Sequence, residues 1–115
     1  MTISILHNPR CSKSRQALHI LREKGVEPNI IEYLNTPPSE QAMDNILRLM
    51  GKEPREVMRR KEPEYREQEL DNPDLTREQL IAAMVATPKL IERPIVVGNG
   101  KAALGRPPED VLKVL

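Results

Sequence analysis

Cys11 is the residue of this sequence best suited to nucleophilic chemistry. It is the only cysteine among 115 residues, so it cannot close an internal disulfide. A helix is expected to begin there, and the dipole and unpaired N–H groups of a helix start stabilise a thiolate. Arg10, Lys13 and Arg15 add charge of the kind that lowers a thiol pKa. We therefore predict an activated nucleophile rather than the alternative, a small hydrophobic residue in the core.

The turn before Cys11 is suited to holding an oxyanion. The segment His7-Asn8-Pro9-Arg10 leads into the expected helix, whose first N–H groups have no partners inside the helix. We assign Asn8 and Ser14 to oxyanion binding, and His7 and Arg15 to tuning of the thiolate. An alternative for His7 is that it satisfies backbone groups at a strand end. Because Ser14 stands where a Cys-x-x-Cys pattern has its second cysteine, electrons must come from an external thiol.

Composition excludes several other classes of function. Eighteen Lys and Arg against 17 Asp and Glu give a net charge of +1, so no global field attracts nucleic acid or an anionic membrane. Two tyrosines are the only aromatic residues, which leaves no stacking platform for nucleic acid. No apolar run is long enough to span a membrane, and no export signal is present, so we expect a cytoplasmic protein. Two histidines and one cysteine do not make a zinc site, and we expect a monomer without a metal.

The two ends of the sequence predict a small mixed sheet. Strand-like runs of β-branched and apolar residues lie at 2–6, 29–34, 94–97 and 101–104. The apolar spacing from 11 to 24 predicts a helix that ends at Gly25. Gly98-Asn99-Gly100 is a hairpin turn signal, and Pro107-Pro108 is expected to begin a closing helix.

The middle of the sequence predicts helices. Ser39 is a candidate cap for a helix ending at Gly51, and a shorter helical piece is expected around 55–60. The charged stretch 61–73 is predicted to be irregular surface. Thr76 and Gln79 have the spacing of a capping box for a helix that ends before Pro88.

The resulting order, βαβ, helices, then ββα, is that of an α/β thioredoxin-like fold with a helical insertion. We predict a single domain over residues 1–115. Its core is expected at about 1–36 and 89–115, and its insertion at about 37–88.

Four segments carry a resemblance to a known family. The run from His7 to Arg15, HNPRCSKSR, resembles the active-site signature of the glutaredoxin- and glutathione-dependent arsenate reductases. Glu92-Arg93-Pro94-Ile95-Val96-Val97, Gly105-Arg106-Pro107 and Val57-Met58-Arg59-Arg60-Lys61 resemble the family's arginine-bearing segments. Arg10, and a chain ending at Leu115, place the sequence nearer the shorter chromosomal branch of that family.

The resemblance implies a fold and a chemistry. It implies a thioredoxin-like fold, an arsenic adduct on Cys11 and no bound cofactor. Arsenate is then the substrate, glutathione the reductant and glutaredoxin the protein partner, in arsenic detoxification. Three arginines are expected to hold the oxyanion: Arg59, Arg93 and Arg106, with Arg60 as the alternative to Arg59. The Arg93–Pro94 peptide bond is expected to be cis.

Two other functions remain open from the sequence. A monothiol oxidoreductase acting on glutathione mixed disulfides also needs only one nucleophilic cysteine. A regulator that binds RNA polymerase is known in the same superfamily, but such regulators commonly carry Cys-x-x-Cys. The arginine set and Ser14 favour the reductase over both.

Overall fold

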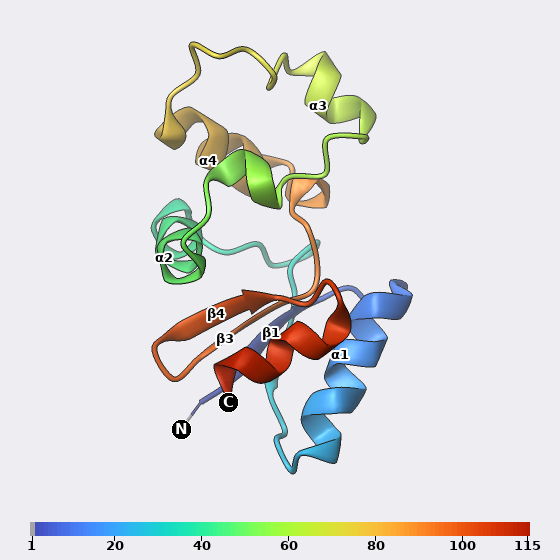
Figure 1. Ribbon diagram of the computed structural model, residues 1–115. Helices are drawn as coiled ribbons and strands as arrows, with labels where there is room; N and C mark the ends of the chain where they lie inside the picture. The colour runs from blue at the N-terminus through green and yellow to red at the C-terminus, as the bar shows by residue number, and fades with distance from the viewer. Residues whose placement is uncertain (1) are drawn as a thin grey trace. The chain divides into compact units, whose positions relative to one another are not determined.

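A computed structural model describes residues 2–115. The chain divides into two compact units (Figure 1). The sheet unit contains the residues up to Thr36 together with Arg93–Leu115, and the helical unit is Pro37–Glu92. The single domain expected from the chain length stays a prediction.

The sheet unit is built on four short strands in the order β2-β1-β3-β4. These are β1 (Ser4–His7), β2 (Asn29–Glu32), β3 (Ile95–Gly98) and β4 (Lys101–Leu104). β1 runs parallel to β2 and antiparallel to β3, and β3 and β4 form an antiparallel hairpin. Asn99 and Gly100 in its turn both have positive φ, 54° and 70°, which explains why the sequence has Asn-Gly there.

One face of the sheet is covered by α1 (Ser12–Glu23) and by a closing 3₁₀ helix, η3 (Pro108–Val114). Apolar side chains from β1, β3, β4, α1 and η3 form one buried cluster: Ile3, Ile5, Ala17, Leu18, Leu21, Val96, Ala103, Val111 and Val114. Ile5 of β1 and Ile3, just before the strand, enter this cluster from the same face, because side chains of an extended chain alternate between faces. The predicted α/β thioredoxin-like order βαβ then ββα is confirmed.

The predicted closing helix differs in type from the observed one. Residues 108–114 form a 3₁₀ helix, with Asp110 N–H donating to the Pro107 carbonyl at 3.0 Å. A run this short that begins at a proline offers few bonds between residues four apart, so tighter i→i+3 bonds take their place.

The helical unit contains α2 (Glu40–Met50), η1 (Pro54–Val57), α3 (Pro63–Glu67), α4 (Arg77–Ala86) and η2 (Pro88–Leu90). Its caps are those expected from sequence. The Ser39 hydroxyl accepts from Ala42 N–H at 3.1 Å, and Gly51 ends α2 with φ 67°. Thr76 and Gln79 form the reciprocal capping box of α4. Each cap satisfies N–H or C=O groups that the helix leaves unpaired.

The prediction that residues 61–73 are irregular surface is wrong in part. This stretch holds α3, and it buries Tyr65 and Leu70. Pro63 begins α3 instead of breaking a helix, because the first turn of a helix does not need the missing N–H. The Arg55 side chain also fixes the stretch by donating to the carbonyls of Leu70 and Asn72.

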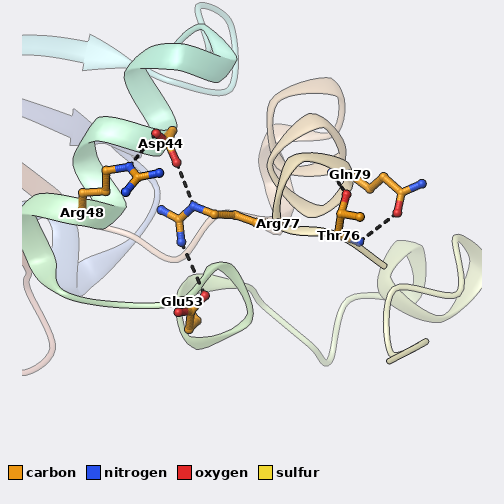
Figure 2. Close-up of polar contacts among 6 residues, drawn as sticks. All are labelled: Asp44, Arg48, Glu53, Thr76, Arg77 and Gln79. Carbon is orange, nitrogen blue, oxygen red and sulfur yellow. Dashed lines mark hydrogen bonds and ion pairs between the residues drawn. The ribbon is translucent and has the colours of Figure 1, made fainter. Parts of the chain in front are cut away.

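Ion pairs join α2 to α4 (Figure 2). Asp44 accepts from Arg48 Nε at 2.9 Å and from Arg77 Nε at 2.8 Å. Arg77 also pairs with Glu53, just before η1, at 3.4 Å. One carboxylate on α2 therefore links two arginines from different helices.

Within residues 2–115, no helix has both the length and the apolar character that a membrane crossing requires.

Candidate active site

Strand pairing brings three separated segments to one edge of the sheet. Leu6, near the end of β1, pairs with Ile95 at the start of β3, and Ile95 pairs with Leu104 at the end of β4. The loop before α1, the residues just before β3 and those just after β4 therefore leave the sheet at the same edge. These segments carry Cys11, Arg93 and Arg106.

Cys11 is the N-cap residue of α1 and is partly exposed. A turn sets its position, because Cys11 N–H donates to the Asn8 carbonyl at 3.0 Å. Its own carbonyl accepts the first helical bond, from Arg15 N–H, at 3.0 Å. The first turn of α1 contains no acidic residue. The sulfur thus lies at the positive end of a twelve-residue helix.

The surroundings of Cys11 lower its pKa below the ordinary thiol value. Burial acts in the opposite direction, since it raises the pKa by disfavouring the charged form. The backbone N–H of Ser14, the hydrogen bond and charge of Arg93, and the backbone N–H of Lys13 together outweigh it. Thiolate is thereby favoured by unpaired helix-start donors and by one guanidinium from a distant part of the chain.

The neighbouring cations contribute less to this pKa than their positions in the sequence suggest. The side chains of Arg10, Lys13 and Arg15 are exposed, and none is among the groups that lower the pKa of Cys11. Arg15 Nη1 instead donates to the Pro9 carbonyl at 2.9 Å, which braces the turn. The assignment of Arg15 to thiolate tuning stays a prediction.

His7 and Ser14 form a buried polar pair beneath the turn. Ser14 Oγ lies 2.6 Å from His7 Nδ1 and accepts from Asn8 N–H at 3.1 Å. The pKa of His7 is lowered, mainly by burial, with Arg22 and Arg15 adding to the effect and Glu32 opposing it. A neutral imidazole can accept the Ser14 proton on Nδ1, which leaves the ring proton on Nε2.

These bonds give Asn8 and Ser14 a role in shaping the loop. Asn8 Oδ1 accepts from Arg10 N–H at 3.0 Å, and Ser14 Oγ is occupied by His7 and the Asn8 backbone. Both side chains therefore fix the turn that presents Cys11. Direct contact of either side chain with an oxyanion stays a prediction.

Arg93 has buried hydrogen-bond donors that no acceptor in the described structure satisfies. Its Nε and Nη1 atoms are buried and have no hydrogen-bond partner, although a buried guanidinium donor without an acceptor is costly. The hydrogen-bonding capacity and charge of the same side chain help to lower the pKa of the Cys11 thiol. Planar guanidinium donors of this kind match a tetrahedral oxyanion.

Arg106 is attached to the same corner. Its Nε donates to the Arg93 carbonyl at 3.0 Å, and Gly105 N–H donates to the Pro94 carbonyl at 2.8 Å. A side chain on Gly105 would come within 2.7 Å of Pro94 Cγ, so the close approach requires glycine. The Arg93–Pro94 peptide bond is cis as expected; the cis bond at Arg106–Pro107 was not foreseen, although two consecutive prolines stand there.

Arg59 and Arg60 belong to the helical unit. Arg59 Nη1 pairs with Glu62 at 2.9 Å, and Glu62 also pairs with Lys89 at 3.5 Å. Arg60 is exposed, and its Nε donates to the Arg55 carbonyl at 3.1 Å. The choice of Arg59 as the third oxyanion ligand, with Arg60 as the alternative, stays a prediction.

A metal site is not part of the described structure. Across residues 2–115, no group of three or more His, Cys, Asp or Glu side chains is arranged to hold a metal ion. The chemical groups gathered at the sheet edge are a thiol, helix N–H groups and guanidinium donors. Together they place a thiol of lowered pKa beside guanidinium groups.

Comparison with known proteins assigns this centre to a family. Residues 6–114 match the ArsC family model, and the chain belongs to the ArsC family. An arsenate reductase from Neisseria meningitidis is 47% identical over 114 residues, which covers 98% of this chain and 97% of that protein. The protein YfgD of Escherichia coli, which has no described function, is 52% identical over 98% of this chain and 96% of its own length.

A solved structure shows the same fold. An arsenate reductase from Vibrio cholerae superposes with a TM-score of 0.96 at 48% identity, covering 100% of this chain and 98% of that one. The family resemblance read from the sequence is thus confirmed.

Proposed function

We propose that this protein is an arsenate reductase in which Cys11 is the nucleophile and glutathione and glutaredoxin supply the electrons. The observation that carries the proposal is the pairing of Cys11 with Arg93, whose Nε and Nη1 donors are buried without partners. Relatives named arsenate reductase, matched over nearly their whole length, support the substrate. A cytoplasmic monomer fits the proposal, since a reducing compartment keeps a lone thiol free.

The chemistry divides into balanced steps. The Cys11 thiolate attacks As(V) and one arsenate oxygen leaves as water after protonation, without a change in oxidation state. Glutathione then adds through sulfur, and a second water leaves. A glutaredoxin thiol attacks the glutathione sulfur, which passes two electrons to arsenic and forms a mixed disulfide. Hydrolysis of the Cys11–As(III) bond releases arsenite and restores the thiol.

The residues of the site contribute at identifiable points. Helix N–H groups and Arg93 favour the thiolate before attack. We assign to Arg93, and to Arg106, which donates to the Arg93 carbonyl, the task of offsetting the negative charge of the oxyanion and of the adduct. We include Arg59 as the third cation of this set. Ser12–Glu23 contains no second thiol, which is consistent with an external reductant.

The direct test is arsenate turnover with glutathione and glutaredoxin by the wild type and by Cys11→Ser. We expect the variant to lose turnover, because a serine hydroxyl is not ionised at neutral pH and is a poor nucleophile without a base. Circular dichroism should show the variant folded. Equal rates in the two proteins would overturn the proposal.

A glutathione-dependent monothiol oxidoreductase is the second candidate, and the partly exposed thiol favours it. The two are separated by asking whether arsenate, sulfate or phosphate slows alkylation of Cys11. Protection is expected for the reductase. An absence of protection by all three anions would favour the oxidoreductase, whereas copurification with RNA polymerase and no turnover would favour a regulator.

A further inference from the structure

The charges of this chain are distributed unevenly around Cys11. The first 22 residues contain Arg10, Lys13, Arg15 and Arg22 and no Asp or Glu, although the whole chain is almost balanced, with 18 basic and 17 acidic residues. The first acidic residue is Glu23, at the far end of α1. The segment of sequence that carries Cys11 therefore has cations and no carboxylates, although strand pairing places Glu32 opposite His7.

Two of these four cations, Arg10 and Lys13, do not take part in interactions that hold the fold together. Arg15 is bonded to the Pro9 carbonyl, and Arg22 forms a two-pronged pair with Glu27 at 3.0 to 3.3 Å. Arg10 and Lys13 are exposed, and their side chains make no hydrogen bond or ion pair anywhere in residues 2–115. Neither side chain contributes to the shifted acidity of the thiol.

The backbone nevertheless holds both residues beside the sulfur. Arg10 is next to Cys11 in a turn that is closed by Arg10 N–H donating to Asn8 Oδ1 at 3.0 Å and by Cys11 N–H donating to the Asn8 carbonyl at 3.0 Å. Lys13 is in the first turn of α1, and its N–H stabilises the thiolate. Two exposed cationic residues thus border a partly exposed cysteine in the chain.

We infer that Arg10 and Lys13 form a reductant rim, an exposed pair of cations that recognises the carboxylates of glutathione as its thiol approaches the group on Cys11. This inference rests on the proposed function. Reduced glutathione carries two carboxylates and one ammonium, a net charge of about −1 at neutral pH. It must meet an arsenic adduct that is itself anionic. Cations at the rim reduce that repulsion, whereas Arg93 is already committed to the thiolate and the oxyanion.

The test uses thiol–disulfide exchange, which does not need arsenate. The Cys11 thiolate attacks oxidised glutathione, which forms Cys11–S–S–glutathione and releases one glutathione thiolate. The rate is compared with that for hydroxyethyl disulfide, which is uncharged. The variant is Arg10→Gln/Lys13→Gln, and the matched control is Lys24→Gln, an exposed cation at the opposite end of α1.

We expect the double variant to react up to about tenfold more slowly with oxidised glutathione, the scale of losing two exposed charge contacts. Its rate with hydroxyethyl disulfide, and both rates of the control, should stay at the wild-type level. Added salt should shrink the difference. In arsenate turnover, the KM for glutathione should rise by a similar factor while the KM for arsenate stays unchanged.

Outcomes separate this inference from the proposed function. The inference would be overturned if the double variant reacted equally slowly with both disulfides, or as fast as the wild type with both. A rise confined to the KM for glutaredoxin would also overturn it, because the cations would then be contacting a protein. A different result is that the wild type fails to turn over arsenate while the double variant still reacts more slowly than the wild type with oxidised glutathione alone. In that case the arsenate proposal fails and the inferred role of Arg10 and Lys13 stands.

Discussion

The charged residues around Cys11 in the sheet unit are paired less than those of the helical unit. In the helical unit, cations and carboxylates are paired in networks, as in the Asp44–Arg48–Arg77 set and in the chain from Arg59 through Glu62 to Lys89. At the start of α1 in the sheet unit, the side chains of Arg10 and Lys13 form no ion pair within residues 2–115, and Arg93 has two buried donors without a partner.

The difference separates charged groups that hold the fold together from charged groups that are available to a substrate. Paired surface ions contribute little to stability but fix which helices lie together. Buried donors left without acceptors lower stability, and they persist where a ligand completes them. Glu64 and Arg77 of the helical unit also have a buried polar atom without a partner. What distinguishes Arg93 is that its unpaired donors belong to a side chain that also lowers the pKa of a partly exposed thiol.

The largest expected effect is the removal of the Arg93 charge. Arg93→Gln should reduce kcat/KM for arsenate by about 10²–10³-fold, since one preorganised donor to a developing charge contributes on that scale. Because Arg93 lowers the pKa of Cys11, the pH midpoint for alkylation should move upward in the variant. Lys101→Gln, an exposed charge on β4, is the control. If the pH midpoint for alkylation of Cys11 were unchanged in Arg93→Gln, Arg93 would not be acting on the thiol.

In the helical unit, apolar packing should matter more than charge. Leu47 is fully buried on α2, so Leu47→Ala should lower the free energy of unfolding by about 2–5 kcal/mol through the cavity it leaves. Leu49→Ala, on the same helix with 37% of Leu49 exposed, should have little effect. Urea unfolding measures both. The alkylation midpoint of Cys11 should not change, and a shift would mean that the charges around the thiol depend on this core.

Loss of a helix cap should have a smaller effect. Thr76→Ala removes one half of the capping box of α4 and should cost about 1 kcal/mol of unfolding free energy. Thr76→Ser keeps the hydroxyl and should restore most of that stability. If serine were no better than alanine in thermal unfolding, the bond from Gln79 N–H would not be the reason for the threonine.

The smallest effect is expected at the ion pair of Figure 2. The Arg48 and Arg77 guanidinium groups hold the pKa of Asp44 below its ordinary value. A carboxyl with a depressed folded-state pKa stabilises the protein above its unfolded pKa, and this contribution is lost as the pH falls through the folded value. Asp44→Asn should therefore lower the Tm slightly at neutral pH and not in strong acid. Asp71→Asn, an exposed carboxylate, should match the wild type at both, and an equal loss for Asp44→Asn in acid would contradict the electrostatic reason.

Much of the fold could be predicted because its signals are local. Ser39 and Gly51 bracket α2, Thr76 and Gln79 begin α4, and Asn99-Gly100 turns the hairpin. Each of these residues acts on backbone groups within a few positions of itself. Local signals fail at residues 61–73, because burial of Tyr65 and Leu70 decides the structure of that segment while Pro63 and the surrounding charges indicate irregular surface.

By itself, the sequence determined the single thiol, its position at a helix start and the family motif around it, since all three can be read from neighbouring residues. Only the tertiary structure decided that Arg93, rather than the adjacent Arg10 or Arg15, shares in lowering the pKa of Cys11. The reason is strand pairing: the register of β1, β3 and β4 brings residues far apart in the chain to one edge of the sheet. There, a buried and oriented guanidinium acts more strongly than nearer side chains that extend into water.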